Sequence, residues 1–209
     1  MTEIMISPRR VGKIKVNQGR GIVFSRIEIG DLLKAWIAIS IAFGILLSGF
    51  SSLINFGKMF IVSLFTVGTG FLFHELAHKI TAQHYGCLAE FRAFNPMLLL
   101  AIFMSFFGFV FAAPGAVMIR GVMNREQNGK ISLAGPLTNI ILALIFLIIF
   151  KATSFGIAQI GFTINAYLAV FNMLPFGFFD GAKVFRWNKT VFGVAIGIPI
   201  ALMILNSFI

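Results

Sequence analysis

Long apolar stretches alternate with short polar segments along most of the chain. Six such stretches can be distinguished, at residues 32–53, 58–83, 96–119, 131–150, 156–178 and 190–209. A helix needs about 20 predominantly apolar residues to cross the hydrocarbon core of a bilayer, and five of the six stretches meet that length comfortably. The pattern therefore predicts an all-α integral membrane protein, a bundle of five to six transmembrane helices.

The third stretch, residues 96–119, is less regular than the others. It follows Asn95-Pro96 and is broken at Pro114-Gly115, and proline and glycine interrupt regular helices. The flanking segments 87–94 and 116–123 have a strand-like composition. We expect short β-strands at the membrane surface on either side of this stretch.

The distribution of basic residues indicates how the third stretch lies. Cytoplasmic loops of membrane proteins carry an excess of lysine and arginine. If the N-terminus is inside and the third stretch enters and leaves by the same face, only Lys58 and Lys151 of the 17 basic residues fall outside. A single crossing would place Arg120, Arg125 and Lys130 outside. We therefore expect a re-entrant segment, which is tolerated at membrane depth where protein shields its backbone.

The composition supports a membrane location and removes one class of function. Of the 209 residues, 58% are hydrophobic and only 11% are charged, whereas a soluble domain carries about 25% charged residues. The net charge of +10 would suggest nucleic-acid binding in a soluble protein, but here the basic residues follow membrane topology rather than forming one patch. We expect a multi-pass protein of the cell membrane that contacts the lipid bilayer and binds no nucleic acid.

The N-terminal part differs from the rest of the chain. Residues 1–31 carry six basic residues, which places the N-terminus in the cytoplasm. Residues 11–24 have the pattern of a hairpin, and Ser25 with Glu28 resembles a helix capping box. The chain is thus divided into a basic cytoplasmic segment, 1–31, and a membrane-embedded core, 32–209.

Candidate chemistry lies within the second apolar stretch, at His74-Glu75-Leu76-Ala77-His78. Ionisable groups are costly inside a bilayer, so their presence there indicates function. Residues four apart lie on one face of a helix, so His74 and His78 can bind one metal ion. Glu75 stands where it can act as general base on a water activated by the metal. If the histidines served only in helix packing, an unpaired Glu75 in lipid would be hard to explain.

The third ligand of such an ion must come from elsewhere in the chain, because catalytic zinc commonly takes three protein ligands. His84 has the spacing of a longer zinc motif, but Thr81 replaces the glycine that this motif needs for its turn. Glu90 lies in a polar, strand-like segment. Asp180 is favoured, because it follows a helical stretch interrupted by Pro175 and Gly177, which lets the chain bend around a cavity.

Three motifs within residues 60–190 resemble, in their order, those of the site-2 protease family of intramembrane zinc metalloproteases. The first is the histidine motif described above, and the second, Ala134-Gly135-Pro136-Leu137-Thr138-Asn139, is similar to the family's Gly-x-x-x-Asn segment. The third, from Asn172 to Gly181, is similar to the family's Asn…Pro…Asp-Gly signature. The three together are far more specific than any one of them.

The resemblance implies that His74, His78 and Asp180 bind one zinc ion per chain and that Glu75 is the general base. It also implies that Asn172 assists catalysis by contacting the substrate carbonyl or the oxyanion. The implied function is hydrolysis of peptide bonds in or near the transmembrane segments of membrane-protein substrates, as in regulated intramembrane proteolysis.

Alternatives remain open for the residues and for the whole protein. Asn172 could instead form a hydrogen bond between helices, and Gly135 and Asn139 are expected mainly to permit close helix packing. The protein could be a membrane metal transporter or an inactive protease-like scaffold. A transporter would explain metal ligands in the bilayer but not the adjacent Glu75, and two related halves are not visible in the sequence. A scaffold is disfavoured because all four expected zinc and base residues are present.

Overall fold

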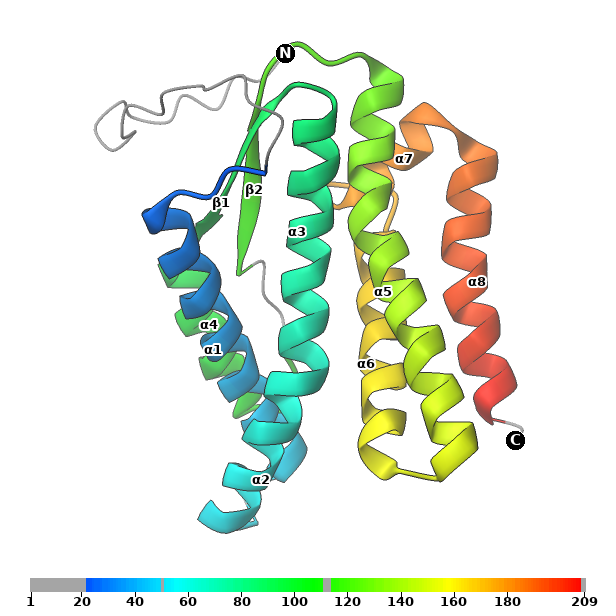
Figure 1. Cartoon of the computed structure of the whole chain (residues 1–209). Helices are drawn as coiled ribbons and strands as arrows, with labels where there is room; N and C mark the ends of the chain where they lie inside the picture. Colours follow the sequence, from blue (N-terminus) through cyan, green and yellow to red (C-terminus); the bar gives the residue numbers. More distant parts are fainter. Residues whose placement is uncertain (1–21, 50, 111–113, 208–209) are drawn as a thin grey trace.

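The computed structural model describes residues 22–49, 51–110 and 114–207, which are mostly helical (Figure 1). Most of the predicted hairpin lies outside these residues. In chain order the elements are α1 Arg26–Ser48, α2 Leu53–Ser63, η2 Leu64–Gly68, α3 Thr69–His84, β1 Leu88–Ala93, α4 Asn95–Ser105, β2 Gly115–Arg120, α5 Arg125–Thr153, α6 Gly156–Asn172, α7 Asp180–Trp187 and α8 Lys189–Ser207.

Four helical segments of the described chain are long and apolar enough to cross a membrane: Arg26–Ser48, Leu53–His84, Arg125–Thr153 and Lys189–Asn206. They could make this a multi-pass membrane protein. α6 has 17 residues, which at about 1.5 Å per residue gives roughly 26 Å, slightly less than the hydrocarbon core of about 30 Å. The expected count of five to six crossing helices therefore stays a prediction.

The two strands predicted beside the third apolar stretch are present as β1 and β2. They pair antiparallel, with Leu88 opposite Arg120 and Ala93 opposite Gly115. Between them lies α4, whose 11 residues span about 16 Å, roughly half of what a bilayer core requires. After β1 the chain forms α4, which packs beside α1. It then returns to β1 and pairs with it as β2 (Figure 1). Whether this segment is re-entrant in a bilayer stays a prediction.

The start of α1 follows its predicted capping box only in part. Ser25 is the N-cap, and its side-chain oxygen accepts the Glu28 backbone N–H at 3.1 Å. The reciprocal hydrogen bond, from the Ser25 backbone N–H to the Glu28 side chain, was predicted wrongly. The Glu28 carboxylate instead turns inward and is buried against Lys79. A complete capping box occurs instead at the start of α5, where Asn124 and Gln127 each bond to the other's backbone N–H.

A π-helical turn, η2, joins α2 and α3 within one continuous helical segment. Such a turn changes the carbonyl pairing within a helix, and here the Leu64 carbonyl accepts the indole N–H of Trp36 at 3.1 Å. Gly68 allows the close approach, because a Cβ there would overlap the Trp36 and Ser40 side chains. The turn fixes α1 against the segment that carries the two histidines.

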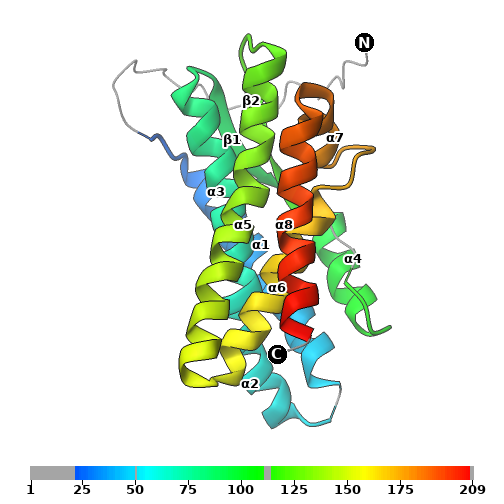
Figure 2. The same cartoon turned by 90° about the vertical axis from the view of Figure 1, so that its right-hand side faces the viewer.

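Figure 1 shows α3 between the sheet and α5, and Figure 2 shows α5 and α8 nearest the viewer. α3 packs against α5 on one side and against the sheet on the other, and α5 packs against α6, which contacts α8. A buried apolar cluster joins α1, α3, β1, α4 and α6. Within it the rings of Phe71 and Phe91 meet edge to face, with centroids 5.7 Å apart. The sheet is therefore packed directly beside α3.

Candidate metal centre

His74 and His78 lie one turn apart on α3 and point to the same side, as their spacing of four residues requires. Both side chains are buried, and their Nε2 atoms are 3.0 Å apart. The pair is therefore placed to present two nitrogen atoms to one ion.

The other nitrogen of each ring faces a hydrogen-bond acceptor. His78 Nδ1 donates to the Ile131 carbonyl at 2.7 Å, and His74 Nδ1 donates to Asn139 Oδ1 at 2.5 Å. Because these oxygens only accept, the ring protons are on Nδ1 and the lone pairs on Nε2. Two lone pairs facing each other at 3.0 Å repel unless a cation lies between them. Such acceptors on the outer nitrogen commonly orient metal-binding histidines.

Asn139 of α5 is itself fixed by two acceptors. Its Nδ2 donates to the Gly70 carbonyl at 3.2 Å and to Asn165 Oδ1 at 3.0 Å, which orients the amide so that Oδ1 faces His74. Asn165 of α6 donates in turn to the Gly161 carbonyl at 2.9 Å. Both asparagines are fully buried. The orientation of one candidate ligand is thus set by a network that spans α3, α5 and α6.

Gly135 allows α5 to approach the two imidazoles. A Cβ atom at this position would overlap the Nε2 atoms of both His74 and His78. The expectation that Gly135 and Asn139 mainly permit helix packing is therefore too narrow. Gly135 provides space beside the candidate ligand atoms, and Asn139 bonds directly to one of the rings.

Asp180 reaches the histidines from the N-terminus of α7. The chain turns back after α6, with Gly177 in the left-handed region at a φ of 61°. Asp180 Oδ2 then lies 3.0 Å from His78 Nε2 and 3.5 Å from His74 Nε2. Lys183, three residues further on, places Nζ 3.3 Å from Asp180 Oδ1. The lysine engages one carboxylate oxygen and leaves Oδ2 to face the histidines.

The three groups fit a zinc ion. Their candidate ligand atoms all lie within 4.8 Å of one another. Zinc held tetrahedrally at about 2.0–2.1 Å separates its ligand atoms by about 3.3 Å, and the distances here are 3.0, 3.0 and 3.5 Å. Two neutral imidazoles and a carboxylate also favour zinc over hard cations, which prefer oxygen ligands. Three protein ligands leave a fourth position open, as in catalytic zinc sites.

Glu75 lies beside these groups and lines a cavity of about 940 Å³. The side chain is buried, and the backbone of Val117 in β2 lies close to its carboxyl group. His74, His78 and Asp180 line the same cavity. A carboxylate in this place can accept a proton from a water molecule next to the candidate ligands.

Asn172, at the C-terminal end of α6, also lines the cavity. Its Nδ2 donates to the Leu168 carbonyl of the same helix at 2.9 Å. To contact a substrate, the amide must exchange that hydrogen bond for one to the substrate. The catalytic role expected for Asn172 stays a prediction.

His84 and Glu90, the other candidates for the third ligand, lie elsewhere. His84 is exposed at the end of α3, with its ring against Tyr85. Glu90 in β1 accepts a hydrogen bond from Ser25 and forms an ion pair with Arg92 at 2.7 Å. In the described part of the chain, neither belongs to the group of candidate ligands around His74.

Asn165 and Lys183 are not among the residues expected at the site, although the sequence around each of them carries a signal. Asn165 is a polar residue in the middle of an apolar stretch, where an unpaired amide is costly. Lys183 follows Asp180 by three residues, a spacing that brings side chains together on a helix. The signal at Lys183 points to Asp180, whereas the partner of Asn165 cannot be identified without the fold.

Comparisons with known proteins agree with this chemistry. The chain is 46% identical, over 184 residues, to a protein of Methanocaldococcus jannaschii named "putative zinc metalloprotease". The match covers 85% of this chain and 92% of that relative. No family model matches the chain, and no solved structure matches it.

Proposed function

Because the chain belongs to a zinc metalloprotease family with one zinc ion as cofactor, we propose that it is an intramembrane protease of the site-2 protease type. Its substrates are membrane proteins, which it hydrolyses at peptide bonds in or near a transmembrane segment, as in regulated intramembrane proteolysis. His74, His78 and Asp180 are its zinc ligands, and Glu75 is its general base.

One observation carries the proposal: the ligand atoms of His74, His78 and Asp180 converge within 4.8 Å. Both histidines belong to Leu53–His84, a segment long and apolar enough to cross a membrane. A site on such a helix is most directly reached by a substrate that is itself in the membrane. The adjacent Glu75 supplies a proton acceptor, which hydrolysis needs and metal transport does not.

The residues around the cavity have separate roles in hydrolysis. When bound, zinc polarises the scissile carbonyl and makes water acidic enough to react near neutral pH. Glu75 takes a proton from the water that adds to the carbonyl carbon, and it delivers that proton to the amine as the C–N bond breaks. Asn172 donates a hydrogen bond to the oxyanion that develops on the carbonyl oxygen.

The β2 strand is the expected docking place for the substrate. A transmembrane helix hides its peptide bonds in internal hydrogen bonds, so a segment must unwind before it can be cut. We expect the unwound segment to pair with β2 by strand addition, because Gly115, Ala116, Val117 and Ile119 line the cavity. Proline substitutions along Val117–Met123 that leave cleavage intact would exclude this part of the proposal.

The test is cleavage in a bilayer. The full chain and Glu75→Gln are reconstituted with zinc into vesicles that contain a panel of single-span membrane proteins. We expect the wild type alone to cut at least one of them, with mass spectrometry placing the cut in or near the transmembrane segment. Cuts confined to the parts of these proteins that lie far from the transmembrane segment would contradict the proposal. Zinc flux across the vesicle membrane, equal in both variants and without cleavage, would favour a transporter.

A further inference from the structure

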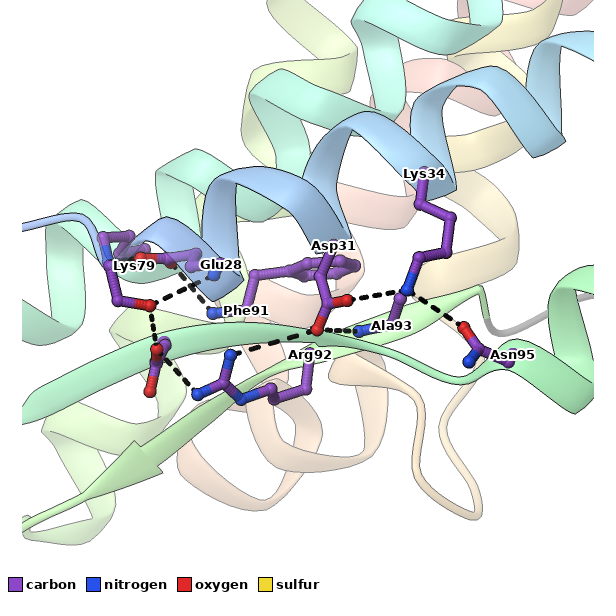
Figure 3. Close-up of polar contacts among 10 residues, drawn as sticks. Glu28, Asp31, Lys34, Lys79, Phe91, Arg92, Ala93 and Asn95 are labelled. Carbon is purple, nitrogen blue, oxygen red and sulfur yellow. Dashed lines mark hydrogen bonds and ion pairs between the residues drawn. The ribbon is translucent and has the colours of Figure 1, made fainter. Parts of the chain in front are cut away.

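The two-stranded sheet has two edges, and side chains close the outer edge of β1. In an antiparallel pair, residues that point their N–H and C=O groups at the partner strand alternate with residues that point them away. Three residues of β1 bond outward to side chains of α1 and α3: Ala89, Phe91 and Ala93. Figure 3 shows the bonds of Phe91 to Glu28 and of Ala93 to Asp31.

Glu28 of α1 and Lys79 of α3 form the centre of this closure. Glu28 Oε1 accepts the Phe91 N–H at 2.9 Å, and Lys79 Nζ donates to the Ala89 carbonyl at 3.0 Å. The two side chains also bond to each other, at 2.7 and 2.6 Å, and both are fully buried. The three N–H groups of the ammonium and both carboxylate oxygens are therefore used.

Asp31 closes the next position along β1. It follows Glu28 by three residues and so lies on the same face of α1. Its Oδ2 accepts the Ala93 N–H at 3.3 Å, and its Oδ1 lies 3.0 Å from Lys34 Nζ. Side chains of α1 and α3 thus occupy the place that a third strand would take beside β1.

The opposite edge of the sheet, on β2, faces the catalytic cavity. The outward residue Phe91 pairs with Val117, so Val117 also points its N–H and C=O away from the partner strand. Gly115, Val117 and Ile119, the partners of the three outward residues of β1, all line the cavity. The Val117 backbone lies close to the Glu75 carboxyl group. Within the described residues, the Glu75 carboxyl group approaches the outward backbone of Val117, and the rest of the β2 edge is open to another strand.

We propose that Glu28, Lys79 and Asp31 are positioning residues that replace a third strand. They close the β1 edge, tie it to α1 and α3, and hold β2 beside Glu75, so that a substrate strand pairs only with β2. A segment paired with β1 would lie on the far side of the sheet from the catalytic residues. This inference rests on the proposed protease function, since it assigns the substrate to the β2 edge.

Two double variants separate strand closure from charge pairing. Glu28→Gln with Lys79→Met removes both charges but keeps an amide oxygen that can accept the Phe91 N–H. Glu28→Lys with Lys79→Glu keeps an ion pair but reverses its orientation. A donor then faces the Phe91 N–H and an acceptor faces the Ala89 carbonyl, so neither hydrogen bond to β1 can form. If the two residues serve only as an ion pair, the reversed pair is the milder change.

The readouts are hydrogen exchange of the strand amides and cleavage of the panel protein that the wild type cuts best, both on the zinc-loaded full chain. We expect the neutral pair to keep slow Phe91 exchange and a near-normal KM. The reversed pair is expected to speed that exchange at least about tenfold and to raise KM several-fold, with kcat little changed. Slow exchange in the reversed pair would overturn the closure, and fast exchange with a normal KM would overturn the claim that the closure holds β2 in place for the substrate.

Asp31 offers a test that leaves the buried pair in place. Asp31→Asn keeps an oxygen for the Ala93 N–H, whereas Asp31→Leu removes it. We expect only Asp31→Leu to speed Ala93 exchange and raise KM, and equal behaviour of the two variants would contradict the inference. Hydrogen exchange needs no substrate, so it tests the closure even if the protease proposal fails for lack of cleavage.

Discussion

Two buried polar clusters lie against α3, and they differ in whether their hydrogen-bonding capacity is used. In the pair Glu28 and Lys79, each charged group is matched by partners within the chain. In the cluster of His74, His78 and Asp180, two ring nitrogens and a carboxylate oxygen converge on one point. The first cluster needs nothing from outside, whereas the second is completed by a cation. The two clusters thus differ in that the ring nitrogens and the carboxylate oxygen of His74, His78 and Asp180 remain available to bind a cation.

The two clusters nevertheless begin at neighbouring residues. His78 and Lys79 are consecutive on α3, but successive helical residues point about 100° apart. His78 therefore faces α5 and the Ile131 carbonyl, while Lys79 faces α1 and β1. One helix turn thus serves the metal on one side and the sheet on the other, and substitutions at these two positions are expected to have different consequences.

Loss of a ligand is expected to have the largest effect. His78→Ala removes one of three converging atoms, so we expect purified protein to lose its zinc and all proteolytic activity. Zinc per chain after dialysis and cleavage of the panel substrate are the measurements. His84→Ala, which changes an exposed histidine of the same helix, serves as control and should keep both. One zinc per chain in His78→Ala would contradict the site.

Glu75→Gln separates binding from catalysis within the same cluster. The amide cannot accept the proton of water, so we expect kcat to fall by about 10²–10⁴-fold. Zinc content should stay at one per chain, since Glu75 is not among the converging ligands. Glu90→Gln is the matched control in β1. Retention of more than about a tenth of kcat in Glu75→Gln would exclude it as general base.

Lys79→Met tests the buried pair of Glu28 and Lys79. It leaves the Glu28 carboxylate buried without its ion-pair partner, which we expect to lower the free energy of unfolding by about 3–5 kcal/mol. The affinity for zinc in the remaining folded protein should be nearly unchanged. Denaturant unfolding and zinc titration are the two measurements. A large loss of zinc affinity without loss of stability would contradict the claim that Glu28 and Lys79 stabilise the fold and do not contribute to metal binding.

Asn139→Ala tests whether a residue that is not itself a ligand orients His74 for metal binding. The substitution removes the acceptor that holds His74 Nδ1, so the ring can rotate, and we expect zinc affinity to fall about 10–100-fold. Competition with a chelator gives the affinity. Thr138→Ala is the neighbouring control, since Thr138 bonds only to the Ala134 carbonyl of its own helix. Equal affinities in the two variants would contradict the orienting role.

The residues that the structure brings together can be predicted from the sequence, because their spacing and surroundings carry the signal. A period of four residues places His74 and His78 on one face whatever the rest of the fold. The sequence favours Asp180 because the preceding stretch is interrupted by Pro175 and Gly177. The position of Asp180 beside the histidines depends on the turn that follows Asn172. The same turn ends α6 after 17 residues, so this helix is shorter than the fifth predicted span.

Other features could not be predicted, because they depend on how distant elements meet. Glu28 and Lys79 are 51 residues apart, and in the sequence Glu28 reads as a capping residue. Asn165 has a role only through Asn139, which lies 26 residues away on another helix. The register of β1 with β2 decides which backbone groups face the cavity, and periodicity within one strand does not give that register.

The central claim, that two histidines and one aspartate hold a catalytic zinc, is tested most directly by X-ray absorption at the zinc edge. The sample is the full chain purified in detergent with one equivalent of zinc. The account predicts two imidazole nitrogens at about 2.0–2.1 Å and a carboxylate oxygen at about 2.0–2.2 Å, with one imidazole fewer in any zinc left in His78→Ala. A zinc environment without imidazole, or one unchanged in His78→Ala, would contradict it.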